Sequence, residues 1–138
     1  MKSYYLEIIS PEGIVFKGQI DSLILPGVSG SFGILNDHCP FFAALDIGVV
    51  EVKYFENPVS DFFATSGGFF QMIENKALIL SEYFEIGKHI DIESVKDNLE
   101  HIIELSGSAS ISNEQKHKLK RIMKISEAKI KAHEMYNL

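Results

Sequence analysis

The spacing of apolar residues changes at Gly87, and this change limits the folds that the chain can adopt. Before Gly87, segments such as 48–55 place apolar side chains at every second position, which is typical of a strand with one buried face. The side chains expected on that face are Val50, Val52 and Tyr54. After Gly87 the apolar residues recur every three or four positions, as on one face of a helix. The sequence therefore predicts a strand-rich part over residues 1–86 and a helical part over residues 87–138.

Short strands separated by turn residues account for most of the first part. Pro11, Gly13 and Pro58 are among the residues that interrupt the apolar segments. The expected strands cover residues 4–10, 14–25, 48–55, 61–73 and 76–84. Strands of this length and spacing predict an antiparallel β-sandwich or barrel. Because no helix of crossover length lies between them, we do not expect a parallel α/β sheet.

The second part has the pattern of two helices. Asp91 is placed to cap the first helix, and Ser112 and Gln115 have the spacing of a capping box at the start of the second. The segment 107–110 is rich in Gly and Ser and separates them. The expected apolar faces consist of Ile92, Val95, Leu99, Ile102 and Ile103 in the first helix, and of Leu119, Ile122, Met123 and Ile130 in the second. Both faces are narrow, so we expect an antiparallel two-helix hairpin that buries little surface and is able to move.

Charge is distributed unevenly along the chain. The net charge is −6, yet residues 1–111 carry 6 Lys against 16 acidic residues, whereas residues 112–138 carry 6 Lys and 1 Arg against 3 acidic residues. A basic helix on an acidic body favours an acidic protein partner. Nucleic acid is not expected as a partner, because the acidic body repels phosphate and the basic helix contains a single Arg.

The sequence also bears on where the protein is found. A single cysteine, Cys39, excludes an internal disulfide and fits a reducing compartment. No apolar run is long enough to cross a bilayer, and the first ten residues do not have the pattern of a secretory signal. We therefore expect a cytoplasmic protein without a membrane anchor of its own.

Three short stretches contain residue types that perform chemistry in other proteins. The stretch from Gly27 to Gly33 lacks the Lys and the following helix of a phosphate-binding loop, so its glycines are better explained by tight turns. Tight turns alone do not explain why Phe32 stands among them. The triplet 37–39, Asp-His-Cys, would suit a metal ion or a Cys-His nucleophile, but three consecutive residues rarely converge on one point. The Ser66-Gly67-Gly68 stretch lacks a nucleophile elbow and indicates a β-bulge or a close backbone approach.

Two of these stretches carry a family resemblance. The segment "PGVSGSFGILNDHCPFFAAL" and the later segment "ATSGGFFQM" resemble the ε subunit of bacterial F-type ATP synthases, in order and at the right separation. The resemblance implies a non-catalytic rotor subunit without a cofactor, which docks on the γ subunit and on the ring of c subunits and reaches the membrane only through the complex, at its cytoplasmic face. The positions that match the γ-facing and ring-facing motifs are Gly30, Ser31, Phe32, Gly33, His38, Ser66, Gly67 and Gly68.

The resemblance also implies a function for the helical hairpin. In the family it is a regulatory arm that reaches toward acidic loops of the catalytic β subunits and restrains ATP hydrolysis. The basic residues expected to make those contacts are Lys116, Lys120, Arg121 and Lys124. A nucleotide-binding motif of the family is only partly present, since Glu85 and Asp91 remain, but Ser94 and Val95 replace its Arg and Ala. We therefore expect a vestigial site that binds ATP weakly or not at all.

Two other classes of protein are compatible with the residues alone. One is a free-standing β-sandwich adaptor whose basic helix binds an acidic protein partner. The other is a small metal-dependent enzyme that uses the 37–39 triplet. Copurification distinguishes the three classes, because the first predicts γ and β subunits, the second an unrelated partner, and the third activity from the isolated chain.

Overall fold

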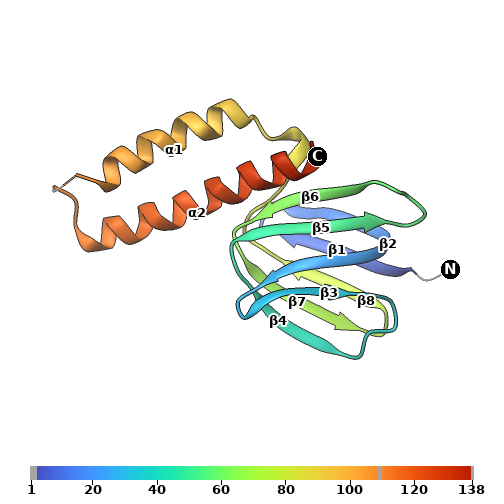
Figure 1. Cartoon of the computed structure of the whole chain (residues 1–138). Helices are drawn as coiled ribbons and strands as arrows, with labels where there is room; N and C mark the ends of the chain where they lie inside the picture. The colour runs from blue at the N-terminus through green and yellow to red at the C-terminus, as the bar shows by residue number, and fades with distance from the viewer. Residues whose placement is uncertain (1–2, 109, 138) are drawn as a thin grey trace.

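The computed structural model describes residues 3–108 and 110–137, in which strands are followed by helices (Figure 1). Within these residues a nine-stranded sheet is followed by a short 3₁₀ helix and two α-helices. The strands are β1 Tyr4–Ser10, β2 Gly13–Gly27, β3 Gly30–Ile34, β4 Phe41–Leu45, β5 Gly48–Tyr54, β6 Ser60–Thr65, β7 Gly68–Ile73, β8 Lys76–Leu80 and β9 Phe84–Ile86. The helical elements are η1 Gly87–His89, α1 Ile92–Ser106 and α2 Asn113–Tyr136. The predicted fold class is confirmed.

The long strand β2 holds the two layers of the sandwich together. It pairs with β1 along its first half and with β3 and β5 along its second half, and Gly27 at its end pairs with Leu45 of β4. The strand order is β1-β8-β7-β4-β2-β5-β6-β9, with β3 added beside β2 and a further pairing of β1 with β2. All pairings are antiparallel except that of β1 with β8, which is parallel. This long-range pairing is the one departure from the expected antiparallel pattern among the described strands.

The core lies between the two layers and follows the alternation of the strands. Val50 and Val52 are fully buried, as predicted from the segment 48–55. Tyr4 is also buried, and its hydroxyl donates a 2.6 Å hydrogen bond to the Ile34 carbonyl oxygen. The largest fully buried side chains are Tyr4, Phe70, Leu6, Ile8, Ile20, Leu23, Leu25, Ile34, Met72, Ile79, Val50 and Val52. Each such side chain stabilises the fold by about 1.5–3 kcal/mol relative to exposure, so the sandwich has a substantial core of its own.

The segment 61–73 forms two strands, not the single expected one. Strand β6 ends at Thr65 and β7 begins at Gly68, and Gly67 and Gly68 have φ angles of +99° and +143°. A Cβ atom on Gly68 would collide with the carbonyl oxygen of Leu80. Of the two expected explanations for the paired glycines, close backbone approach is the correct one, and the segment turns there instead of bulging.

Both helix starts are confirmed. The Asp91 side chain accepts a hydrogen bond from the Ser94 backbone N–H at 3.3 Å. Ser112 and Gln115 form both hydrogen bonds of a capping box at the start of α2. The two helices pack on each other, and α2 also packs on β6 and on η1. Figure 1 shows the C-terminal end of α2 against the sandwich, while its N-terminal end points away from it. We call α1 and α2 together the arm.

Small side chains make the contact between the arm and the sandwich. The buried residues of α2 are Ser126, Ala128 and Ala132, which we call the arm seam. The expected apolar face was therefore wrong in part, because Ile122 is 44% exposed. The arm seam meets Gly87, where a Cβ atom would lie only 2.5 Å from the carbonyl oxygen of Ala132. Ala128 and Ala132 also form an apolar cluster with Ala64 and Ile90. The arm is thus anchored by small side chains of α2 that pack closely on the sandwich, with Phe62 and Tyr83 packed against the same cluster.

Candidate interaction surfaces

One outer face of the sandwich exposes a continuous group of apolar side chains. The cross-strand register makes Ile14, Ile9, Leu80, Phe69 and Ala44 direct neighbours across five strands. They point outward because alternate residues of the same strands, such as Ile8, Phe70 and Ile79, are buried. Phe42 and Leu78 lie two positions along on the same face, on either side of Gln71. We call the set Ile9, Ile14, Phe42, Ala44, Phe69, Leu78 and Leu80 the outer band.

The outer band is unusually exposed for residues of its kind. Phe42 and Phe69 are 65% and 67% exposed, and Ile14 is 58% exposed. Phe42, Phe69, Leu78 and Leu80 also line a shallow groove of about 380 Å³. A contiguous exposed apolar patch marks a protein–protein or membrane interaction site or a ligand-binding groove. The sequence patterns did not predict this face, because alternation shows that a strand has two faces but not that its outer face is apolar across five strands.

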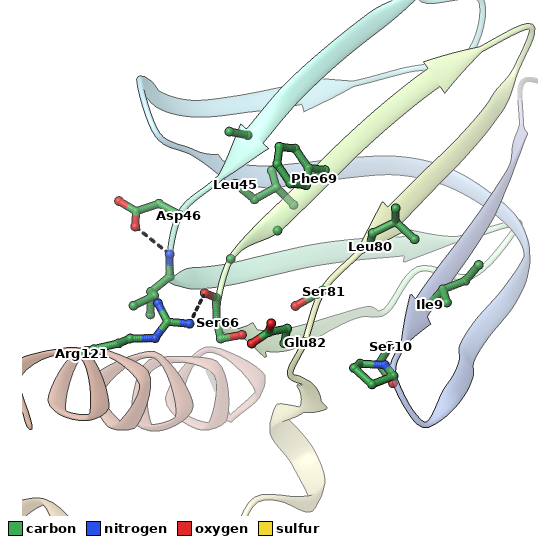
Figure 2. A pocket seen from close by; sticks show the side chains of 15 residues that line it. Ile9, Ser10, Leu45, Asp46, Ser66, Phe69, Leu80, Ser81, Glu82 and Arg121 are labelled. Atoms are coloured by element: carbon green, nitrogen blue, oxygen red, sulfur yellow. Dashed lines mark hydrogen bonds between the residues drawn. The ribbon is translucent and has the colours of Figure 1, made fainter. Parts of the chain in front are cut away.

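A larger pocket of about 640 Å³ lies at one end of the outer band, where α2 approaches the sandwich (Figure 2). Its apolar walls include Ile9, Phe69 and Leu80 of the outer band. Arg121 of α2 also lines it, and its Nη2 donates a hydrogen bond of 3.5 Å to the Ser66 carbonyl oxygen. We call this the arm pocket. It is the place where the outer band and the arm meet.

The glycine motifs of β3 and β7 lie at the same end of the sandwich. Gly30 pairs with Gly27, Gly27 with Leu45, and Leu45 with Gly68, so that one row of residues crosses four strands. Ser66 and Gly67 precede Gly68 directly and line the arm pocket. The structure therefore brings together the two motifs that are far apart in the sequence.

His38 lies away from that row. It follows β3 and precedes Phe41, which pairs with Met72, four positions along β7 from Gly68. Its neighbour Asp37 is fixed by Asn75 in the turn between β7 and β8, with hydrogen bonds of 2.6 and 2.8 Å. The structure thus separates His38 from Gly30 and Gly68 by about the length of a strand, although His38 and Phe32 both pack against the Phe41 ring.

The side chains of the β3 motif point in two directions. Phe32 packs inward, with its ring 5.3 Å from that of Phe41 and 5.9 Å from that of Phe70. Its place among the glycines is therefore explained by the core, and it is not an exposed side chain at a turn. Ser31 and Gly33 are exposed. A Cβ atom on Gly33 would have only an ordinary contact of 3.7 Å, to the Leu23 carbonyl oxygen.

Within the described residues the triplet 37–39 gathers no metal site, but the side chains of His38 and Cys39 approach each other, contrary to the expectation for adjacent residues. The His38 Nδ1 lies 2.8 Å from the Cys39 carbonyl oxygen and 4.0 Å from its Sγ. In the part of the chain that the structure describes, no three His, Cys, Asp or Glu side chains gather closely enough to hold a metal ion. The His38 ring instead packs edge-on against Phe41 at 5.5 Å.

The basic side chains of α2 point mostly to solvent. Lys116, Lys120 and Lys124 are exposed and repeat every four residues, so they form one row along the helix. Lys129 lies over the Tyr83 ring, with its Nζ 4.9 Å from the ring centroid. Among the described residues, Lys88 forms an ion pair of 3.7 Å with the buried Asp61. No basic residue of α2 lies within 4.0 Å of a carboxylate oxygen in the described part of the chain.

The two acidic positions of the expected nucleotide site have internal partners. The Tyr83 hydroxyl donates a hydrogen bond to the Glu85 carboxylate. Burial of Tyr83, followed by this hydrogen bond and the negative charge of Glu85, raises the pKa of Tyr83 well above its ordinary value. Asp91 caps α1, as described above. Ser94 is the third residue of α1, and its backbone N–H donates a hydrogen bond to the Asp91 carboxylate.

The fold and these surfaces define a class: a β-sandwich followed by a two-helix arm, with an exposed apolar face on the sandwich and a basic row on α2. Residues 3–87 match the family model described as "ATP synthase, Delta/Epsilon chain, beta-sandwich domain". The ATP synthase epsilon chain of Leptospira borgpetersenii is 40% identical over 105 residues, which cover 76% of this chain and 81% of that protein. That of Desulfitobacterium hafniense is 37% identical over 91 residues, which cover 66% and 67%. The chain belongs to the ATP synthase epsilon chain family, and it is a non-catalytic subunit of that complex.

Solved structures share the fold at much lower sequence identity. A chain of the Euglena gracilis mitochondrial ATP synthase, solved with OSCP, F1 and the c-ring, aligns with a TM-score of 0.81 at 21% identity and covers 91% of this chain and 78% of that one. A chain of the Tetrahymena thermophila central stalk and c-ring aligns with a TM-score of 0.60 at 14% identity and covers 94% and 95%. In the described residues no helix is both long and apolar enough to cross a membrane.

Proposed function

We propose that this chain is the central-stalk rotor subunit that couples rotation of γ and the c ring to ATP synthesis, and that its outer band docks on the γ subunit. The observation that carries the proposal is the exposure of Phe42 and Phe69 on a continuous apolar face in a subunit of a multi-protein complex. An apolar face of this kind stabilises a complex by about 25 cal/mol for each Å² of apolar surface that the partner removes from water. The face is formed by neighbouring strands of one sheet and contains the groove lined by Phe42, Phe69, Leu78 and Leu80.

We further propose that the row through Gly30, Gly27 and Gly68, together with Ser31 and Gly33, contacts the c ring. Ser31 and Gly33 leave the outer side of β3 almost bare of side chains. A partner backbone is therefore able to approach that strand closely. The inward packing of Phe32 supports this use, because it ties the thin strand to the core. Through γ and the ring the subunit is held at the cytoplasmic face of the membrane.

The arm is proposed to restrain ATP hydrolysis by reaching acidic loops of the β subunits. Lys116, Lys120 and Lys124 form an exposed basic row, and the carboxylates of a partner are their chemical complement. Exposed ion pairs contribute only about 0.2–1 kcal/mol each, so this row biases the arm and does not lock it. The arm seam consists of small side chains, each of which buries little surface, and this is consistent with an arm that leaves the sandwich reversibly.

Copurification with matched variants tests the docking proposal. Phe42→Asp and Phe69→Asp place a charge in the outer band, and Val59→Asp places the same charge at another apolar position that is 58% exposed. We expect the Phe42 and Phe69 variants to lose γ from the purified complex, while the Val59 variant keeps it. Retention of γ by all three variants would show that the outer band is not the docking face. Recovery of an unrelated acidic protein in place of γ and β would favour the adaptor alternative.

A further inference from the structure

The arm pocket places three charged side chains from three different elements around one opening. Asp46 comes from the turn between β4 and β5, Glu82 from the link between β8 and β9, and Arg121 from α2. Figure 2 shows Arg121 reaching from the helix toward Ser66, with Asp46 on one side of it and Glu82 on the other. All three residues are exposed in this structure, where water solvates their charges.

The same pocket shares its apolar walls with the outer band. Ile9, Phe69 and Leu80 belong to both. A partner that covers the outer band at this end therefore also covers the opening of the pocket. Water is then displaced from Asp46, Glu82 and Arg121 together.

The energetic consequence depends on where the arm lies. With the arm in place, the partner covers two carboxylates together with a guanidinium that lines the same pocket, although Arg121 forms no ion pair within 4.0 Å in the described structure. With the arm released, it covers two carboxylates and no cation. Removing an uncompensated charge from water is much more costly than removing a compensated set.

We infer that Arg121 couples partner docking to the position of the arm, because it supplies the counter-charge for Asp46 and Glu82 beneath an apolar partner surface. The inference rests on the proposed docking of γ on the outer band. If contact of the arm with the sandwich raises the affinity for γ by some factor, then binding of γ raises the equilibrium constant for that contact by the same factor. The coupling therefore opposes release of the arm in the assembled complex, and the contacts that the released arm makes with the β subunits must outweigh it.

The test is a mutant cycle of charged residues, in which the affinity of the full-length chain for purified γ subunit is measured. Arg121→Gln removes the counter-charge, and Lys118→Gln is the control that removes the same charge from an exposed position of α2 outside the pocket. We expect Arg121→Gln to weaken γ binding about fivefold, at the lower end of typical coupling between sites, and Lys118→Gln to have little effect. In an Asp46→Asn/Glu82→Gln background, Arg121→Gln should leave the affinity unchanged or raise it, because no carboxylates remain to be neutralised.

A second measurement follows the arm itself by amide hydrogen exchange in residues 126–132. Addition of γ should slow exchange there in the wild-type chain and have a much smaller effect in the Arg121→Gln variant. The coupling is refuted if Arg121→Gln and Lys118→Gln are equivalent in both backgrounds, or if γ accelerates exchange in the arm seam. Failure of the proposed function would differ, since γ binding would then be absent or insensitive to Phe69→Asp.

Discussion

Replacing Gly87 by Ala should release the arm while leaving the sandwich folded. Gly87 is buried beneath the arm seam, and the added Cβ atom would lie 2.5 Å from the Ala132 carbonyl oxygen and 3.0 Å from that of Phe62. Both obstructing atoms are backbone, so no side chain is able to rotate away. To restore an ordinary contact of 3.4 Å, α2 must move outward by about 0.9 Å.

That movement weakens the contact between the arm and the sandwich. Overpacking of a well-packed contact typically costs about 1–3 kcal/mol. The same displacement lengthens the hydrogen bond between His133 Nδ1 and the Gly87 carbonyl oxygen, which is 3.1 Å. A shift of 1–3 kcal/mol changes the equilibrium between attached and released arm by about 5- to 150-fold. The sandwich core does not include Gly87, so its stability should change little.

Amide hydrogen exchange of the isolated chain measures this equilibrium. We expect residues 126–132 of Gly87→Ala to exchange faster by a factor in the stated range, while β1, β7 and β8 keep their protection. Gly107→Ala is the matched control, because its Cβ atom would have ordinary contacts of 3.7 and 3.8 Å within the arm. Equal protection of α2 in Gly87→Ala and in the wild-type chain would refute the close contact as the anchor of the arm.

Three further predictions concern the complex and its ligands. Gly33→Asp should weaken assembly with the c ring. The isolated sandwich should stay folded, because the new side chain has open space at that position. Wild-type rates of proton-driven ATP synthesis in this variant would contradict the proposed contact. Deleting the residues after Gly87 should raise ATPase activity and leave coupling largely intact, and unchanged hydrolysis would mean that the arm has no inhibitory effect. The isolated chain should bind ATP weakly or not at all, because Ser94 lacks the charge and the directed hydrogen bonds of an Arg. This difference weakens the binding free energy of ATP by about 1.5–3 kcal/mol. Saturable binding at low-micromolar ATP in calorimetry would contradict the prediction.

Local patterns in the sequence predicted the elements whose causes are local. The aromatic and β-branched residues before the turn at Pro11 correctly predicted β1, which covers Tyr4–Ser10 as expected, and alternation of apolar residues correctly predicted β5. Side-chain chemistry at Asp91 and Ser112 correctly predicted both helix starts, because a cap depends on residues within one turn.

Features with long-range causes were missed. The strands β3 and β4 were not predicted, because glycines and prolines around them resemble turn residues and their strand geometry is imposed by pairing with β2 and β7. The arm seam was missed because Ala128 and Ala132 carry little hydrophobic signal, and their importance comes from the absence of a side chain on Gly87. The outer band depends on which strands become neighbours, and the parallel pairing of β1 with β8 that joins Ile9 to Leu80 has no local signature.

Photo-crosslinking from the outer band in the assembled ATP synthase tests the central claim most directly. A photoreactive phenylalanine analogue in place of Phe69 preserves the shape of a side chain that is 67% exposed, and the same analogue in place of Val59 provides a control on another surface. The account predicts that position 69 forms a covalent adduct with the γ subunit in high yield and that position 59 does not. An assembled complex in which position 69 labels no subunit, or labels γ no better than position 59, would contradict it.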